Sequence, residues 1–345
     1  MHIALDAMGG DRGSEDIVLG ALQAVKEADL YVSLFGDEKK LVAILKGSGQ
    51  GNSDRINIVH TTQVIGMGES PIESIRRKTD SSVVVAFDRL RAGEVDAVVS
   101  AGNSGATMAA AVRSLGRLKG IARPGIASIL PTLKKPVVMM DVGANVDCRP
   151  KHLFQFGLMA AAFSEVIIGN SRPRVGVLSI GEEQGKGNTL VRKTDELFRN
   201  SSLNYVGNIE GGDTFKGDVD VIACDGFVGN VCLKISEGLA EAMTTMLRTE
   251  INNSLLAKAG YLLSRGAFAR FKKRIDYAEY GGAPLLGLKG TGIVCHGRSN
   301  AVAIKNAIFV AAGAVDNKVN ERIIEMLAAA ENNAEADDLE KGAVA

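Results

Sequence analysis

Short apolar runs alternate along this chain with amphipathic segments of helical length, a pattern that predicts βαβ units around a mainly parallel sheet. We therefore expect an α/β fold in which helices flank that sheet. The predicted strands are residues 2–6, 31–35, 56–59, 95–100, 136–141, 174–179, 204–209 and 219–224, with a further apolar run at 292–295. The predicted helices are residues 14–27, 38–46, 80–92, 104–118, 151–168, 188–199, 230–251 and 299–316.

The length of 345 residues exceeds the usual range of a single core. We expect residues 1–330 to form one large α/β domain of two lobes that share a core, with an inserted amphipathic helical segment at 252–276. Residues 331–345 hold five acids and one lysine among small residues, and we expect a disordered acidic tail there.

Loops rich in Gly, Asn and Asp follow five of the apolar runs. Because the carboxyl ends of parallel strands share one edge of a sheet, where ligands bind, we expect the five loops to meet in one cleft. The candidate binding residues in these loops are Asp6, Gly9, Gly10, Gly102, Ser104, Gly105, Asp141, Asp225, Gly226, Gly229, Gly297 and Ser299.

The same loops also open predicted helices. Any one of them could serve only as a cap or a tight turn, because Asn103, Asn230 and Asn300 are good N-cap residues. Repetition at five strand ends favours a shared site. Helix N-termini with exposed N–H groups suit an anion, above all phosphate.

Nucleotide-binding motifs do not fit this chain. The segment GEEQGKGN at 181–188 lacks the spacing and the terminal hydroxyl of a P-loop, and GGDRG at 9–13 is not GxGxxG. The expected anion is therefore neither an ATP of the Walker type nor an ordinary dinucleotide. Lys186, between Gly185 and Gly187, could swing onto a phosphate or could be a solvated lysine on a loop.

Two other features are candidates for acid–base or anion chemistry. His296 lies at the expected cleft and could act as a general acid or base, or could cap its turn. Three cations, Arg76, Arg77 and Lys78, precede a predicted helix start. They form either a solvated face or a clamp for phosphate or an acidic partner.

We expect no metal and no cofactor. The four histidines are scattered, and although Asp6, Asp141 and Asp225 could hold Mg²⁺, we expect them to orient neighbouring side chains and loop amides instead. The four cysteines form no CxxC pair, so neither a zinc site nor a disulfide framework is indicated. Cys224 and Cys295 end apolar strands and are expected to be buried, inert thiols.

Charge and hydropathy exclude some classes of protein. With 40 basic and 40 acidic residues, the chain is not a broadly basic nucleic-acid binder. It has no apolar run of the roughly 18 residues that a spanning helix needs, and no signal peptide at its start. A cytoplasmic protein is the expectation.

Residues 254–275 depart from this overall neutrality, with six basic residues and no acid. Apolar residues at helical spacing run along the segment, Gly266 is expected to end the first helix, and a second short helix is expected to follow. Such a segment suits a membrane surface or an acidic partner. The alternative is a helical hairpin packed on the body or at a dimer interface. The candidate membrane-facing residues are Leu255, Leu256, Leu262, Leu263, Phe268 and Phe271.

Five motifs carry a resemblance to a known family over nearly the whole chain: VSAGN at 99–103, DVGAN at 141–145, GEE at 181–183, CDGFVGN at 224–230 and GGAPLLG at 281–287. Together they resemble the bacterial phosphate acyltransferases (acyl-ACP:phosphate transacylases) of phospholipid synthesis. The sequence departs from the family pattern at Ser104 and Arg298, where Thr and Ser are commoner.

The resemblance implies transfer of a long-chain fatty acyl group from acyl carrier protein to inorganic phosphate. The acyl phosphate product would pass to a downstream glycerol-3-phosphate acyltransferase. The resemblance also implies a fold like phosphotransacetylase and the isocitrate/isopropylmalate dehydrogenases. It implies a homodimer, bound peripherally to the inner face of the cell membrane.

Our mechanistic hypothesis is direct attack of phosphate on the thioester carbonyl. Asn103, Asn145 and Asn230, with loop amides at 102–105 and 226–230, are the expected oxyanion donors. Lys186 and His296 would bind phosphate or protonate the leaving thiolate, and Lys78 is a further candidate for substrate binding. The alternatives are an NAD-dependent 2-hydroxy-acid dehydrogenase of similar fold, a short-chain phosphotransacetylase, and a non-catalytic lipid-surface scaffold.

Overall fold

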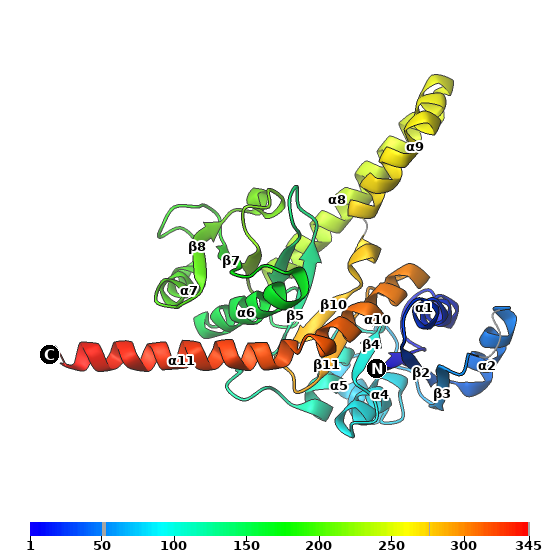
Figure 1. The fold of residues 1–345 in the computed structure, drawn as a ribbon, viewed down its shortest axis with the longest axis horizontal. Coiled ribbons are helices and arrows are strands. Elements are labelled where there is room, and N and C mark those ends of the chain that lie inside the picture. Colours follow the sequence, from blue (N-terminus) through cyan, green and yellow to red (C-terminus); the bar gives the residue numbers. More distant parts are fainter. Residues whose placement is uncertain (50–52, 276, 344–345) are drawn as a thin grey trace.

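The computed structural model describes residues 1–49, 53–275 and 277–343 (Figure 1). Eleven strands of the described chain form one sheet in the order β3-β2-β1-β4-β11-β10-β5-β6-β9-β7-β8. The predicted α/β class with a mainly parallel sheet flanked by helices is confirmed.

The first half of the sheet is parallel throughout. It consists of β1 (His2–Asp6), β2 (Tyr31–Gly36), β3 (Ile56–His60), β4 (Ala97–Ser100) and β11 (Thr291–Val294). The helices of this half are α1 (Ser14–Glu27), α2 (Glu38–Gly47), α3 (Pro71–Arg77), α4 (Ser82–Arg91), α5 (Ser104–Leu115) and α10 (Ala301–Asp316).

The second half is parallel within itself but runs in the opposite direction. Its strands are β6 (Val137–Met140), β7 (Arg174–Leu178), β8 (Asn204–Ile209) and β9 (Val221–Ala223). Between the halves lie β10 (Ala283–Leu286) and β5 (Gly125–Leu130), paired antiparallel with each other and with β11 and β6 respectively. The α-helices of this half are α6 (Pro150–Phe163), α7 (Thr189–Arg199) and α11 (Val319–Ala343). It also contains the π-helical turn η1 (Ser164–Ile168) and the 3-10 turn η2 (Gly211–Phe215). The 3-10 turn η3 (Tyr277–Tyr280) precedes β10.

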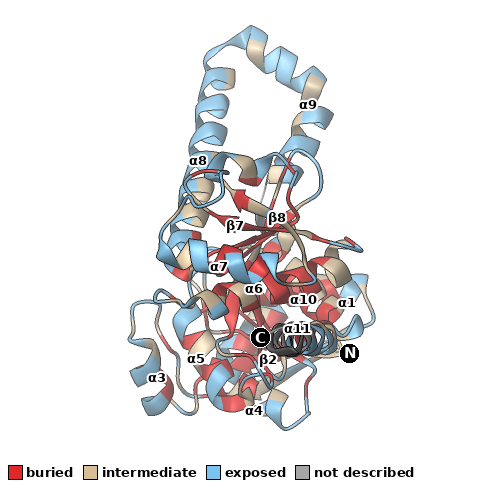
Figure 2. Ribbon diagram, turned by 90° about the vertical axis from the view of Figure 1, so that its left-hand side faces the viewer, coloured by how far each residue is buried: buried red, intermediate tan, exposed pale blue. Residues whose placement is uncertain are grey.

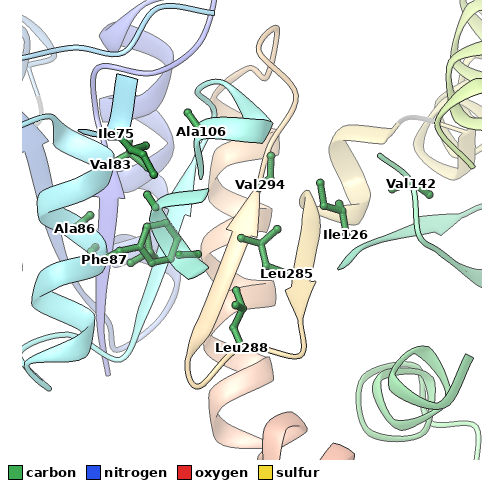
Figure 3. Packing of buried hydrophobic residues seen from close by; sticks show 14 of the residues in the cluster. Ile75, Val83, Ala86, Phe87, Ala106, Ile126, Val142, Leu285, Leu288 and Val294 are labelled. Atoms are coloured by element: carbon green, nitrogen blue, oxygen red, sulfur yellow. The ribbon is translucent and has the colours of Figure 1, made fainter. Parts of the chain in front are cut away.

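Alternate residues of each strand pack on opposite faces of the sheet. In β1, Ile3 and Leu5 face the cluster made with α1 and α10, whereas Ala4 faces the cluster made with α4 and α5. The α4 and α5 cluster continues across the middle of the sheet, where Leu285 lies between Phe87 and Ile126 (Figure 3). On the other face of the second half, α6, α7 and α11 cover the strands. One core cluster therefore spans both halves, and whether they fold as one domain stays a prediction.

Two long helices form an arm that projects from this body (Figures 1 and 2). They are α8 (Gly226–Asn253) and α9 (Leu255–Ile275), which contact each other along the arm. No residue of α9 is buried. None of the helices in the part of the chain that is described is long and apolar enough to cross a membrane.

The expected break at Gly266 is wrong, because α9 is continuous through it. A glycine inside a helix costs only about 1 kcal/mol relative to alanine, and the Ala, Leu, Lys and Arg residues around it are good helix formers. The chain turns instead at Ser254, between α8 and α9, so the hairpin is longer than the 252–276 segment.

The sequence pattern missed β5, β10, α3 and α11. β10 begins Ala283-Pro284, and a proline argues against a central strand by pattern. The backbone of α11 is helical to Ala343, whereas its side chains beyond residue 332 and residues 344–345 lie outside the description. The disordered acidic tail over 331–345 therefore stays a prediction.

Candidate active site

Asp6, at the carboxyl end of β1, is the centre of the first polar cluster. Its carboxylate is buried and accepts hydrogen bonds from four donors. Oδ1 accepts from the backbone N–H groups of Met8 and Gly9, both at 3.2 Å, and from Ser82 Oγ at 2.6 Å. Oδ2 accepts from Ser100 Oγ at 2.7 Å. Asp6 thus joins the β1 loop, the start of α4 and the end of β4.

The loop after β4 packs directly on the loop after β1. A Cβ on Gly9 would lie 2.6 Å from the nitrogen of Gly102, so only glycine lets the two backbones approach this closely. Gly10 has φ +94°, and the Asp11 N–H donates to the carbonyl of Gly297 at 2.7 Å. Ser299 is buried behind this turn, and its N–H donates to the His296 carbonyl. The loops after β1, β4 and β11 therefore meet, as predicted.

Asn103 caps α5 and holds a strap, which we define as residues 64–70. Its Oδ1 accepts from the N–H of Ala106 at 3.0 Å, and its Nδ2 donates to the carbonyls of Met67 and Glu69 at 2.9 and 3.1 Å. Both Nδ2 hydrogens are thus used within the protein. Ser104 and Gly105 lie exposed in the first turn of α5, where helical N–H groups lack helical acceptors.

Lys78 secures the strap rather than pointing at an open site. Its Nζ donates to Glu69 Oε1 at 2.6 Å and to the Val64 carbonyl at 2.7 Å. The hydrogen bond from Lys78, with others from Gly66 and Ser74, lowers the pKa of Glu69 to about 2. Arg76 and Arg77 remain exposed on α3, so the predicted cationic clamp would be made by these two alone.

A small pocket opens between the strap and the three-loop cluster. Its lining includes Asp6, Gly9, Ser82, Gly102, Asn103 and Thr107. The Thr107 hydroxyl contacts the Ser100 hydroxyl, with the two oxygens 3.3 Å apart. Several predicted binding residues therefore share one concave site with hydroxyl groups that the sequence analysis did not single out.

His296 lies at the edge of the first cluster and is half-buried. Burial is the main reason that its pKa lies below the ordinary value of 6.5, and the charge of Lys234 on α8 adds to the effect. Its Nδ1 accepts from the Arg298 N–H at 3.0 Å, so the neutral ring carries its proton on Nε2. Asn230 lies one helical turn before Lys234, on the same face of α8.

A second polar cluster forms around Asp141, which is fully buried at the carboxyl end of β6. Oδ1 accepts from the N–H groups of Ile126 and Ala144, and Oδ2 accepts from both the backbone and the side chain of Asn145, at 2.6 and 2.9 Å. The second hydrogen of Asn145 Nδ2 goes to the Pro124 carbonyl at 2.8 Å. Burial raises the pKa of Asp141 despite these hydrogen bonds. The amide of Asn145 has no hydrogen left for a substrate.

The N-terminus of α8 closes this second cluster. Asp225 caps the helix by accepting from the N–H groups of Phe227 and Val228, and the Gly226 N–H donates to the Asn145 carbonyl at 2.7 Å. A Cβ on Gly229 would lie 2.0 Å from the Asp141 carbonyl oxygen. The expectation of open loop amides at 226–230 is wrong for 226–229, because the Asn145 carbonyl and the side chain and carbonyl of Asp225 already accept from them.

The five loops therefore form two clusters and not one cleft edge. The shared-edge argument assumed that all strands run in one direction, whereas β10 and β5 reverse the direction between the halves. α8 links the clusters, since it starts at Asp225 and passes His296 at Lys234. Asn230 is exposed between them, with Oδ1 3.6 Å from where a Cβ on Gly143 would lie.

Lys186 belongs to neither cluster. It is exposed on the loop after β7, between Gly185 and Gly187, both of which have positive φ. Its backbone N–H donates to the Glu183 carbonyl at 3.1 Å. The role of Lys186 in binding phosphate stays a prediction.

The three strand-end aspartates accept hydrogen bonds from loop amides and side chains, which confirms the orienting role expected for them. Within residues 1–49, 53–275 and 277–343, no three His, Cys, Asp or Glu side chains gather as a metal site would require. Cys224 and Cys295 are buried as predicted, and burial raises the pKa of both thiols, that of Cys295 to about 12.

Comparisons with known proteins agree with this architecture. A family model described as "Fatty acid synthesis protein" matches residues 1–322. A phosphate acyltransferase of Syntrophotalea carbinolica is 55% identical over 339 residues, which cover 98% of this chain and 97% of that protein. The phosphate acyltransferase of Geobacter sulfurreducens is 52% identical over 328 residues, covering 95% and 94%.

Solved structures show the same fold at low identity. A phosphotransacetylase from Streptococcus pyogenes has a TM-score of 0.65 at 17% identity, covering 92% of this chain and 94% of that one. A 4-hydroxythreonine-4-phosphate dehydrogenase from Klebsiella pneumoniae has a TM-score of 0.53 at 14% identity, covering 91% and 99%. These structures confirm the fold predicted from the motifs. The full-length relatives and the family model together show that this chain belongs to the phosphate acyltransferase family.

Proposed function

We propose that this enzyme transfers a long-chain fatty acyl group from an acyl carrier protein thioester to inorganic phosphate, giving an acyl phosphate. The names of the relatives support phosphate as the acyl acceptor. The observation that carries the proposal is the contrast between the two clusters. The second is closed by its own carboxylate cap, whereas the first keeps a pocket and the exposed first turn of α5.

Phosphate would bind at the mouth of the first pocket, whose interior has room for about one water molecule, against the N-terminus of α5. The positive end of the helix and the unpaired N–H groups of its first turn favour an anion there. Asp6 is the one carboxylate in the lining, and its oxygens already accept from Ser82, Ser100 and two backbone N–H groups. The Asp6 oxygens therefore face donors of the protein and not the phosphate.

The reaction needs no acyl-enzyme. A phosphate oxygen attacks the thioester carbonyl, the C–S bond breaks, and the proton of the phosphate monoanion or dianion ends on the leaving thiolate. Because a thioester is already activated, the main tasks of the enzyme are positioning and stabilising the oxyanion. His296, neutral and protonated on Nε2, can donate a hydrogen bond to phosphate or to the leaving sulfur, while the proton itself comes from phosphate. Asn230 is the exposed amide on the facing side of α8.

The arm supports a long-chain, lipid-related substrate over a short acyl group. Leu255, Leu256, Leu262 and Leu263 on α9 are each more than two-thirds exposed, beside six basic residues without an acid in 254–275. Apolar side chains with cations suit the surface of an anionic membrane. We therefore propose peripheral attachment at the inner face of the cell membrane, where a downstream glycerol-3-phosphate acyltransferase would take up the product.

We also propose a homodimer formed through α8. Ile235, Leu239, Met243 and Met246 repeat at helical spacing along α8 and are all exposed. A stripe of this kind is covered in most soluble proteins. Leu239→Glu, compared with wild type by sedimentation equilibrium, should yield monomers; a dimer of unchanged stability would contradict the proposed interface.

The function is tested by following free thiol released from long-chain acyl carrier protein with and without phosphate. We expect release that depends on phosphate and on the carrier-bound substrate. Cys224→Ala and Cys295→Ala should keep turnover within a few-fold of wild type. Loss of all turnover in either variant, with the fold intact, would favour a covalent route; release that ignores phosphate would refute the function.

A further inference from the structure

Ser82 contributes to the first pocket from a distant part of the chain. It is the first residue of α4, is 2% exposed, and donates to Asp6 Oδ1 at 2.6 Å. The two other donors to this oxygen, Met8 N–H and Gly9 N–H, lie at 3.2 Å. The Ser82 hydroxyl therefore makes the shortest of the three hydrogen bonds, and it is the one made by a side chain that mutation can remove.

Asp6 connects the Ser82 hydroxyl to the loops of the pocket. Its Oδ2 accepts from Ser100 Oγ, and the Ser100 oxygen in turn accepts from the Gly102 N–H at 3.1 Å. A hydrogen-bonded chain thus runs from Ser82 through Asp6 and Ser100 to Gly102. Gly9 joins this chain through its N–H, which donates to Asp6, and its backbone contacts that of Gly102.

We propose that Ser82 is a positioning residue for phosphate, acting through Asp6 on the backbones of Gly9 and Gly102. The inference rests on the proposed function, because it assumes that phosphate binds in the first pocket. Without the Ser82 hydroxyl, Asp6 loses the shortest of its hydrogen bonds to Oδ1, and it holds the two loops less firmly. We expect phosphate binding to weaken and binding of the acyl donor to stay as before.

The neighbouring residue provides a matched control. Ser81 is also fully buried at the start of α4, but its hydroxyl has no hydrogen-bond partner among the residues that the structure describes. Ser82→Ala and Ser81→Ala therefore remove the same atom from adjacent buried positions. Only the first variant breaks a hydrogen bond to Asp6.

The test is the steady-state kinetics of purified full-length variants, with phosphate and acyl carrier protein thioester varied separately. A hydrogen bond to a charged group is worth about 1.5–3 kcal/mol, so Ser82→Ala should raise KM for phosphate by roughly tenfold or more. KM for the thioester should stay within about twofold, and Ser81→Ala should match wild type. If Ser82→Ala does not fold, Ser100→Ala, which removes the second side-chain donor to Asp6, should show the same split.

A double-mutant cycle separates a route through Asp6 from a general loss of structure. In an Asp6→Asn background, Ser82→Ala should raise KM for phosphate far less than in wild type. An unchanged KM for phosphate in folded Ser82→Ala, equal effects of Ser81→Ala, or full additivity with Asp6→Asn would each overturn the inference. Failure of the wild-type enzyme to release thiol with phosphate would instead overturn the proposed function.

Discussion

Gly9 and Gly102 lie in loops more than ninety residues apart in the sequence, yet a Cβ on Gly9 would lie 2.6 Å from the Gly102 nitrogen and 2.7 Å from Asp6 Oδ2. Two backbones can approach this closely only where side chains are absent. The contact brings the loops after β1 and β4 into one wall of the pocket.

Gly9→Ala should therefore damage the site more than the fold. The methyl group must push the Gly102 backbone or Asp6 aside, and we expect turnover to fall by about 100-fold or more, since misplacement of about 1 Å costs that much. Gly68→Ala, in the strap, is the control, because its Cβ would meet no atom within 4 Å. Near-normal turnover of Gly9→Ala, measured alongside its circular dichroism, would show that the close approach is not needed.

The ring of His296 should titrate below its ordinary pKa of 6.5. Burial is the first cause and the charge of Lys234 adds to it, so the imidazole is neutral at physiological pH. Lys234→Ala should raise the pKa toward 6.5 without reaching it, because the burial remains. NMR titration of the histidine ring protons measures both values, with Lys40→Ala on α2 as a control of equal charge. A wild-type pKa at or above 6.5 would contradict this geometry.

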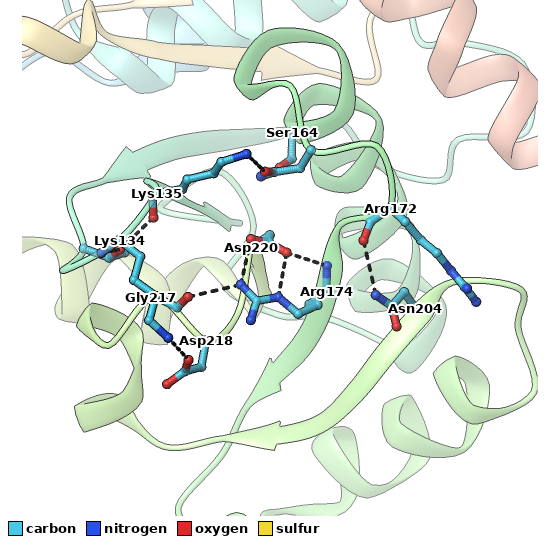
Figure 4. A network of polar contacts seen from close by, with 11 residues as sticks. Lys134, Lys135, Ser164, Arg172, Arg174, Asn204, Gly217, Asp218 and Asp220 are labelled. Atoms are coloured by element: carbon cyan, nitrogen blue, oxygen red, sulfur yellow. Dashed lines mark hydrogen bonds and ion pairs between the residues drawn. The ribbon is translucent and has the colours of Figure 1, made fainter.

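Arg174, the first residue of β7, donates two hydrogen bonds to Asp220, which directly precedes β9. The bonds measure 2.9 and 3.1 Å and belong to a wider polar network (Figure 4). Asp220 is buried and Arg174 is partly exposed. Arg174→Ala should lower the free energy of unfolding by about 2 kcal/mol, less than the roughly 3–5 kcal/mol for a fully buried pair. Urea unfolding measures the loss, and Arg12→Ala, which breaks an exposed pair with Asp16, should cost less than about 1 kcal/mol.

The same pair has a defined pH dependence. Burial alone would raise the pKa of Asp220, but hydrogen bonds from Arg174 outweigh it and hold the pKa below 3.8. A carboxylate with a lowered pKa in the folded state stabilises the protein above its unfolded pKa. The contribution of the pair should thus be complete above pH 3.8 and disappear as the pH falls further. A difference between wild type and Arg174→Ala that persisted in stronger acid would contradict the assignment.

Leu262→Glu should weaken binding to anionic liposomes. Leu262 is 69% exposed on α9, and a carboxylate there opposes both the apolar contact and the attraction of the basic face. Binding of wild type should also weaken with added salt. Ile180→Glu is the control: Ile180 is an isomer of leucine, is 83% exposed on the loop after β7, and its variant should bind as wild type does. Undiminished binding by Leu262→Glu in vesicle sedimentation would refute the membrane-facing arm.

The sequence predicted the α/β fold and most strands because the apolar runs are short, regular and followed by turn residues. It placed Asp6, Gly9, Gly102 and Asn103 in one site for the same reason. It could not predict the reversal at β10 and β5, because strand direction depends on pairing between distant segments, and Pro284 hides β10. The prediction of a single cleft of five loops was wrong for that reason.

The positions of the Ser82, Ser100 and Thr107 hydroxyl groups could not be predicted from the sequence for a different reason. Serines at helix starts and strand ends are common. Only the fold shows that Ser82 and Ser100 donate to the Asp6 carboxylate and that Thr107 contacts Ser100. The pattern VVSAGNSG after β4 contained a usable signal, since Ser100 precedes the Gly102 turn. Nothing in the sequence indicated that Lys78 would be paired with Glu69.

The account depends most directly on phosphate being the acyl acceptor. The decisive measurement is mass spectrometry of the lipid product formed from acyl carrier protein thioester and phosphate labelled with ¹⁸O at every oxygen. Attack by a phosphate oxygen predicts a fatty acyl phosphate that keeps all of the label, formed in equal amount to the thiol released. Free fatty acid as the first product, or thiol released without any labelled acyl phosphate, would contradict the account.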